Sequence, residues 1–218
     1  MAVMIVLASC NGPASRPPAE GSAHGSAKGT AMATTSPDLT ALGQGLQKDA
    51  ARDIPPFGAD SVKLAGRLGP AATQLLVQRV QARGADALLA LEALRVADPA
   101  GYAAQPASAR AEVYVAALQR NAYFNSWGQP GMKLTDTALA FAALGEEAVR
   151  VLAPLLDDRR PAPSSGSQDA TLSQANGNRL CDYAWVLIHE ARNSDYAYSS
   201  SPADRDREIA AMRAALKP

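Results

Sequence analysis

One apolar pattern occurs twice in this chain, and this internal repeat is the sequence feature that most constrains the fold. Residues 68–80 read Leu-Gly-x-x-Ala-x-x-x-Leu-x-x-x-aliphatic, and residues 144–156 repeat the pattern after an offset of 76 residues. Because the apolar residues behind each Leu-Gly pair recur at helical spacing, each copy predicts a turn that leads into an amphipathic helix. The offset corresponds to two units of about 38 residues, and a period near 40 with two helices in each unit is typical of an α-solenoid.

The repeated pattern resembles the HEAT-like repeats of the phycobilisome-lyase type, over roughly residues 65–160. This resemblance implies an all-α solenoid of helix pairs, in which each pair buries its apolar face against its neighbours. Two features depart from the pattern, because the middle unit lacks the Leu-Gly turn and Pro154 lies inside a helix of the second copy. Proline in such a place costs about 3 kcal/mol unless the helix kinks or ends nearby.

Start and stop signals divide the rest of the chain into helices. Ser36-Pro37-Asp38 predicts the start of a helix with proline at its first position, and Ile54-Pro55-Pro56 predicts its end. A stretch rich in Pro, Ser and Gly, Pro161 to Ser167, separates the repeats from a terminal helix pair that we expect to cap the solenoid. The first helix of this pair is apolar over a wide arc, which predicts packing on two sides. The helices expected after the first one cover approximately 62–68, 70–83, 85–97, 107–121, 178–192 and 202–216.

The chain starts with a short apolar run, Met1 to Ala8, that ends in Leu7-Ala8-Ser9-Cys10. These four residues resemble the lipobox of bacterial lipoproteins. The resemblance implies that 1–9 is a signal peptide, that Cys10 is acylated, and that Asn11, which is not acidic, favours the periplasmic face of the outer membrane over the inner membrane. The run is far shorter than the about 20 apolar residues of a transmembrane helix. It is also short and uncharged for a secretory signal, so either the true start lies upstream or the signal is marginal; an incidental Cys10 on a frayed N-terminus is the alternative.

Residues 10–36 are rich in Gly, Ser, Ala and Pro and have almost no large apolar side chains. Such a segment cannot bury enough surface to offset the entropy of ordering, so we expect a flexible tether. Residues 37–218 are enough for one helical repeat domain with a sizeable core.

The charges and cysteines narrow the classes of partner. The chain has 21 basic and 21 acidic residues, and these are interleaved rather than clustered, so no nucleic-acid partner is expected. Lipidation of Cys10 would leave Cys181 without a disulfide partner, and its apolar surroundings in sequence predict a buried free thiol. A disulfide between Cys10 and Cys181 is the less favoured alternative, because it would tie a flexible tail to the core.

The sequence offers few groups for catalysis or metal binding. Asp182 and His189 share a helix face but lie about 10 Å apart along the axis, which is too far for one metal ion. The Cys181 thiol and His189 are similarly separated, so a local nucleophile and base pair fails on geometry. No cofactor, metal or catalytic residue is expected. A hydrolase that uses Asp182, His189 or Glu190 remains only if the fold brings in a second carboxylate or histidine.

Aromatic residues gather in two segments that read as loops. Aromatic anchors on connections between helices suit partner binding, because they bury much area at little cost in entropy. The alternative is that these rings fold back over the core, which we expect especially of Phe124 and Trp127. The candidate partner-binding residues are Tyr123, Phe124, Trp127, Tyr196 and Tyr198.

Together these features predict a lipid-anchored cell-envelope protein that acts as a protein-protein interaction or scaffolding module. Its contacts would be the membrane, through lipidated Cys10, and a protein partner whose identity the sequence does not give. The alternative is an envelope binding protein for a small hydrophobic or cell-wall-derived ligand held between helix pairs. An aromatic-lined cavity with inward polar groups would favour the ligand, whereas a flat exposed aromatic patch would favour a protein partner.

Overall fold

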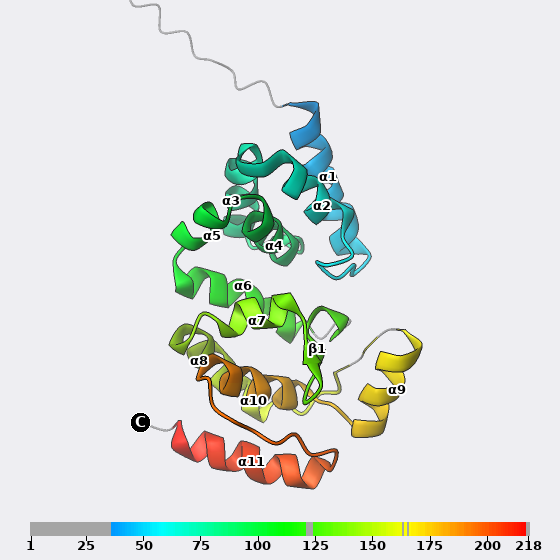
Figure 1. Cartoon of the computed structure of the whole chain (residues 1–218), viewed down its shortest axis with the longest axis vertical. Coiled ribbons are helices and arrows are strands. Elements are labelled where there is room, and N and C mark those ends of the chain that lie inside the picture. Colours follow the sequence, from blue (N-terminus) through cyan, green and yellow to red (C-terminus); the bar gives the residue numbers. More distant parts are fainter. Residues whose placement is uncertain (1–35, 121–123, 163, 165, 217–218) are drawn as a thin grey trace, which may run out of the picture. The chain divides into compact units, whose positions relative to one another are not determined.

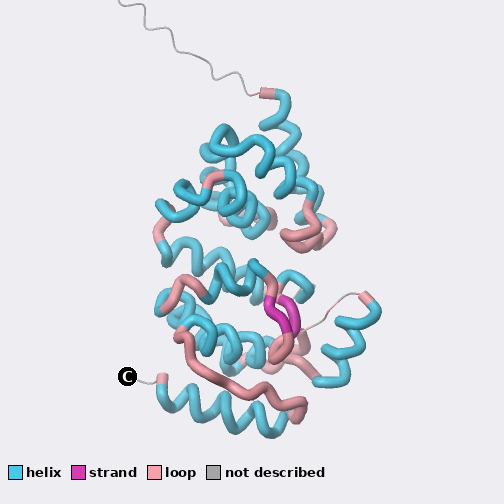
Figure 2. Tube along the Cα trace, in the orientation of Figure 1, coloured by secondary structure: helices cyan, strands magenta, loops and turns pink. Residues whose placement is uncertain are grey.

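The computed structural model describes residues 36–120, 124–162, 164 and 166–216, which belong to one compact unit. This part of the chain is predominantly helical, as expected, with one very short pair of antiparallel strands (Figure 2). None of the described helices combines the length and the apolar character that crossing a membrane requires. Cys10, the signal segment 1–9 and nearly all of the tether 10–36 lie outside the described residues.

The first half of the unit centres on the helix Ala87–Ala97, whose residues are nearly all buried. This helix packs against the two helices that precede it in the chain, Asp60–Leu68 and Thr73–Ala82. It also packs against the later helix Ala107–Gln119. At the N-terminus, the hydroxyl of Ser36 accepts a hydrogen bond from the backbone N–H of Asp38, as the predicted cap requires. The helices are α1 (Pro37–Ala51), α2 (Asp60–Leu68), α3 (Thr73–Ala82), α4 (Ala87–Ala97), α5 (Pro99–Ala104) and α6 (Ala107–Gln119).

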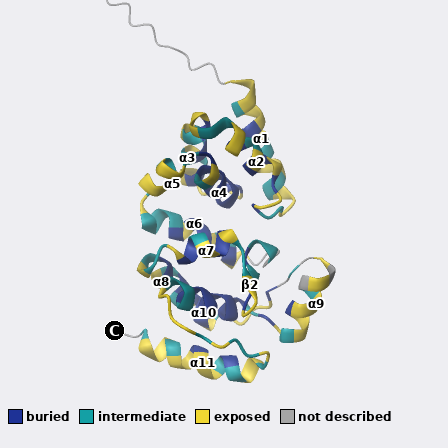
Figure 3. Ribbon diagram, in the orientation of Figure 1, coloured by how far each residue is buried: buried dark blue, intermediate teal, exposed yellow. Residues whose placement is uncertain are grey.

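The second half centres on the helix Leu180–Ala191. All residues from Leu180 to Ile188 are buried, and the helix contacts neighbours on several sides (Figure 3), so the predicted packing of a widely apolar helix is confirmed. Strand Gly128–Gln129 pairs with Lys133–Leu134 in the register Gly128 to Leu134. The elements are β1 (Gly128–Gln129), β2 (Lys133–Leu134), α7 (Asp136–Ala142), α8 (Glu146–Leu152), α9 (Ser167–Asn176), α10 (Leu180–Ala191) and α11 (Pro202–Ala215).

Neighbouring helices pack in a sequence that follows the chain. Contacts run from α1 to α2, from α2 and α3 to α4, from α4 to α6, from α6 to α8, from α8 to α10 and from α10 to α11. Figure 1 shows these helices as successive layers. The core is therefore continuous from one layer to the next.

The repeated Leu-Gly turn has the same backbone conformation in both copies. Gly69 has φ 57° and ψ −145°, and Gly145 has φ 60° and ψ −131°. Residues with a side chain rarely adopt this region, which explains glycine at both positions. Behind the second turn, α8 ends at Leu152 and the chain continues as a 3₁₀ helix, Ala153–Asp157, so Pro154 does not interrupt an α-helix.

Three elements correct the sequence-based assignment. The dipeptide Asp98-Pro99 ends α4 as expected, but the Asp98 carboxylate also accepts a hydrogen bond from the N–H of Gly101 and thereby starts α5. The hairpin β1-β2 occupies part of the segment that was expected to be a loop. Helix α9 lies between the Pro/Ser/Gly-rich stretch and α10, where no helix was expected.

Candidate functional site

Exposed apolar side chains gather in one region of the described chain. Four of them, which are 36% to 67% exposed, line one groove, and the fifth, Leu139, lines a second groove next to it. Scattered single apolar residues are normal on a protein surface, whereas a contiguous group marks a binding site. The four side chains are those of Phe57, Val96, Met132 and Leu172.

The groove that they line is called the main groove below. Its walls are the turn at Pro56 and Phe57, the second half of α4, the hairpin β1-β2 with the start of α7, and α9. Its volume is about 610 Å³, which lies within the range of about 300–1,000 Å³ that is typical of ligand sites. The elements that surround it are far apart in sequence, so the groove exists only in the folded chain.

A buried carboxylate forms the floor of the main groove. Glu92 is only 1% exposed, although it sits within the most apolar part of α4. Its Oε1 accepts a hydrogen bond of 2.5 Å from the hydroxyl of Tyr114, and its Oε2 accepts one of 3.2 Å from the hydroxyl of Thr137. Arg95, one helical turn further on, donates from Nη2 to Oε2 over 2.8 Å. The carboxylate is therefore saturated with hydrogen bonds, as burial of a charge requires.

The two titratable partners of the Glu92 carboxylate, Arg95 and Tyr114, are both in the protonated state that donates hydrogen bonds. Burial would lower the pKa of Arg95, but the hydrogen bond and the charge of Glu92 outweigh it and raise that pKa. Burial, together with the charge of Glu92, raises the pKa of Tyr114 far above its usual value. Tyr114 therefore keeps its proton and acts as a hydrogen-bond donor to Glu92.

Arg95 connects the main groove with a second groove, which lies between α4, α5, α6 and α7 and has a volume of about 530 Å³. Arg95 and Asp136 line both grooves. In the second groove, the guanidinium of Arg110 lies over the ring of Tyr102 at 4.6 Å from the ring centroid. The Nε of Arg110 is buried and makes no hydrogen bond to any described residue.

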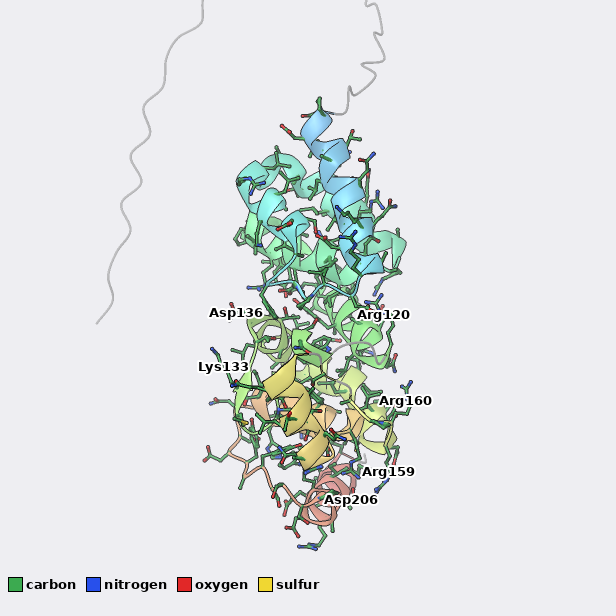
Figure 4. The ribbon with its side chains drawn as sticks, turned by 90° about the vertical axis from the view of Figure 1, so that its right-hand side faces the viewer. Arg120, Lys133, Asp136, Arg159, Arg160 and Asp206 are labelled. Atoms are coloured by element: carbon green, nitrogen blue, oxygen red, sulfur yellow. The ribbon has the colours of Figure 1, made fainter. Side chains whose placement is uncertain are left out.

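Charged residues on the outer surface lie on two sides of α9. In Figure 4, Lys133 and Asp136, which line the main groove, lie to the left of α9, while three labelled arginines lie to its right. Each of these arginines already has a partner within the chain. Arg120 donates to the carbonyl of Ala85, Arg159 pairs with Asp206, and Arg160 pairs with Asp158.

Trp127 folds back over the core, as expected especially of this residue, and is not an accessible aromatic anchor. It is 3% exposed and belongs to the core, with its ring 6.2 Å from that of Phe141. Phe141 in turn stacks on Tyr114 at 5.2 Å. The alternative of a ring folded over the core therefore holds for Trp127. Tyr123 and the side chain of Phe124 lie outside the described residues.

Tyr196 and Tyr198 are half-buried and hold the segment before α11 against α10. Both rings pack on Trp185, at 5.4 Å and 6.3 Å between centroids. The hydroxyl of Tyr196 donates to the Glu190 carboxylate over 2.9 Å, and that of Tyr198 donates to the Asn178 side chain over 2.6 Å. Both residues thus have a structural role, with only part of each ring open to a partner.

His189 shows a similar involvement in packing. Its ring contacts Trp185 and Tyr196, and its Nδ1 is 2.8 Å from the hydroxyl of Ser194. Burial lowers the pKa of His189, although Glu208 of α11 and the adjacent Glu190 act in the opposite direction.

The other candidate groups for catalysis are also accounted for. The Asp182 carboxylate is held by Arg179 and Arg205. Cys181 is a buried free cysteine, and burial raises its pKa to about 11, which makes the thiol inert. The fold does bring Glu208 toward His189, but among the described residues His189 has no hydrogen bond to a carboxylate. No group of three His, Cys, Asp or Glu in the described chain is placed to hold a metal ion.

Sequence reasoning missed the residues at the floor of the groove. The signal that could have found them is a single acidic residue, Glu92, within the otherwise apolar run Ala87 to Leu94. A lone acid on the buried face of a helix needs hydrogen-bonding partners from other elements. The partners Tyr114 and Thr137 lie 22 and 45 residues away in sequence, so no local pattern identifies them.

Comparison with known proteins identified no relative of this chain. No model of a protein family, no curated protein and no solved structure matches the chain.

Proposed function

We propose that this chain is a lipid-anchored cell-envelope protein whose helical domain binds an apolar segment of a protein partner in the main groove. One observation carries this proposal. The five exposed large apolar side chains of the described residues all line the main groove or the second groove beside it. Covering such side chains removes apolar surface from water, which is the dominant favourable contribution to most protein associations.

The shape of the site supports a polypeptide as the occupant. The four exposed apolar side chains form the rim of the main groove and are 36% to 67% exposed. The groove is therefore open to the surface rather than closed around a ligand. Its walls include the turn at Pro56 and Phe57 and the hairpin β1-β2, and such connections are frequent sites of binding function on a rigid scaffold.

The proposal includes a HEAT-like arrangement of the helices. The pairs α2-α3 and α7-α8 are each joined through a Leu-Gly turn of the same conformation, and α10 and α11 close the stack of layers. In an α-solenoid, each unit buries its apolar face against the next and the stack offers an extended binding surface. The main groove, at the junction of the two halves, is such a surface.

The proposal also includes the anchor at Cys10. The buried free thiol of Cys181 supports it, because a lipidated Cys10 could form no disulfide with Cys181. We would express the full-length chain and Cys10→Ala in a bacterial host, fractionate the membranes and determine the mass of the mature N-terminus. An acylated N-terminus at Cys10 that is absent from Cys10→Ala supports the anchor. A soluble, uncleaved product from both chains would reject it.

Site-specific photo-crosslinking tests the groove. We would place a benzophenone amino acid at Met132 in the full-length chain and, as a control, at Gln47 on the exposed face of α1. We expect a discrete crosslinked polypeptide from position 132, none from position 47, and loss of the product when Val96→Asp introduces a charge into the groove. Equal crosslinking at both positions, or a product that Val96→Asp does not change, would contradict the proposal.

A small hydrophobic ligand is the second candidate, because the volume of about 610 Å³ and the polar floor suit a small molecule. Mass spectrometry of the intact purified protein distinguishes the two. A bound molecule of discrete mass that Val96→Asp loses would favour the ligand, whereas its absence together with the crosslink at position 132 would favour the protein partner.

A further inference from the structure

Arg95, which lines both grooves, and Arg110, which lines the second groove, could bind a negative charge on the bound segment. We propose that the segment is apolar and carries one Asp or Glu side chain, whose carboxylate binds Arg95 and Arg110. This inference depends on the proposed groove function and specifies which partner segment the groove selects.

Arg95 has hydrogen-bond donors left over for a ligand. Its Nε and Nη2 donate to the Glu92 carboxylate, at 3.3 Å and 2.8 Å to Oε2. Its Nη1 makes no hydrogen bond to any described residue. The side chain is 31% exposed and lines both grooves, so the guanidinium is accessible at their junction.

The guanidinium of Arg95 is also fixed in place before a ligand arrives. Glu92, to which it is bound, is itself held by Tyr114 from α6 and Thr137 from α7. An arginine that is already ordered loses less side-chain entropy on binding than a free surface arginine. Guanidinium groups suit carboxylates because parallel N–H donors match the two oxygens.

Arg110 supplies the second positive charge. It lies over the ring of Tyr102, which fixes its plane, and its Nε is buried without a hydrogen-bond partner among the described residues. Arg110 lines the second groove and forms no ion pair with any described residue, so its charge is available to a ligand carboxylate there.

The balance of charge around the grooves indicates one carboxylate rather than several. The charged residues that line the two grooves are Glu92, Arg95, Arg110, Lys133 and Asp136. Three are basic and two are acidic, which leaves an excess of one positive charge. One carboxylate neutralises this excess, whereas a second would leave the grooves with a net negative charge.

Selection from a random peptide library tests the inference. We would select phage-displayed random 12-residue peptides on the full-length protein, on Arg110→Gln and on Val96→Asp. Arg110→Gln is the main variant because removal of Arg95 would leave Glu92 buried without its counter-charge and could unfold the protein. Circular dichroism and thermal melting of each variant establish that it folds.

We expect the unsubstituted protein to enrich apolar peptides with one Asp or Glu at a fixed position. On Arg110→Gln the apolar preference should remain while the acid is no longer enriched, and on Val96→Asp both should be lost. A synthetic copy of the best peptide with its acid replaced by the corresponding amide should bind about tenfold more weakly to the unsubstituted protein, since charge-assisted hydrogen bonds are the stronger ones.

The outcomes separate this inference from the proposed function. Enrichment of apolar peptides without an acid, or of the same acid on Arg110→Gln, would overturn the inference and leave the groove function intact. No enrichment of apolar peptides on the unsubstituted protein would contradict the proposed function and the inference together.

Discussion

Arg205 of α11 donates a hydrogen bond from Nε to Oδ1 of Asp182 in α10 over 3.0 Å, and both side chains are almost completely buried. Arg179, just before α10, binds the same carboxylate. This pair joins the last helix to the first turn of α10, where an acidic side chain is also favoured by the helix dipole. The remaining donors of Arg205 are satisfied by the carbonyl oxygens of Ser199, Ser200, Asn176 and Gly177.

Arg205→Met should therefore destabilise the domain strongly. The substitution leaves Asp182 buried with one cation fewer and four carbonyl groups without their donor, and removing one partner of a buried ion pair costs about 3–5 kcal/mol. Urea unfolding followed by circular dichroism measures the loss. Arg207→Met is the matched control, because Arg207 is 73% exposed and its ion pair with Asp204 lies on the surface. If the two variants lose similar free energies of unfolding, the buried pair does not stabilise the packing of α11 on α10.

Tyr114→Phe should lower the free energy of unfolding, because it removes the hydroxyl that donates a hydrogen bond to Glu92. A hydrogen bond to a charged group contributes about 1.5–3 kcal/mol, and the vacated oxygen is too deeply buried to be hydrated easily. Tyr102→Phe is the control, because its hydroxyl contacts that of Tyr114 at 3.2 Å and makes no bond to the carboxylate. We expect Tyr102→Phe to lower the free energy of unfolding by about 1 kcal/mol or less, as measured by urea unfolding. An equal or larger loss in Tyr102→Phe would contradict the role assigned to the Tyr114 hydroxyl.

Gly145→Ala isolates the backbone requirement of the repeated turn. A Cβ at Gly145 would meet no atom of the described residues within 4 Å, so the cost comes from the conformation with φ 60° and ψ −131°. We expect a loss of about 1–3 kcal/mol in the free energy of unfolding. At Gly58 a Cβ would make ordinary contacts from 3.6 Å, and the backbone there has no positive φ. Gly58→Ala should therefore be neutral or slightly stabilising. A neutral Gly145→Ala would mean that the turn tolerates a second conformation.

The helices could be predicted wherever apolar periodicity and stop signals coincide. The turn at Gly69 and its repeat at Gly145 gave the clearest information, since the structure shows one conformation at both sites. Helix α9 escaped prediction because its surface is mostly polar and exposed, so it has no apolar stripe to detect. The hairpin β1-β2 has strands of two residues, which are too short for an alternating pattern.

The candidate site was predicted least well. Aromatic content in loops pointed to Trp127, but packing against Phe141 buries that ring in the core. The rim of the main groove consists of single apolar residues in four separate segments. Each is unremarkable in sequence, and only the fold brings them together. Glu92 was the one local anomaly, and its meaning depends on partners from α6 and α7.

His189 should make the stability of the domain depend on pH in the mildly acidic range. Burial lowers its pKa below the usual value of 6.5, so the unfolded chain takes up a proton at a higher pH than the folded chain. The unfolding free energy should therefore fall as the pH is lowered through about 6.5, until the folded ring is protonated as well. Glu190 and Glu208 favour the protonated ring and limit this effect. Urea unfolding at about pH 7.5 and about pH 5.5 should show a larger loss for the unsubstituted chain than for His189→Gln. If both chains lose stability equally, the pH dependence comes from other groups, and His189 is not held in its neutral form by the packing of Trp185 and Tyr196.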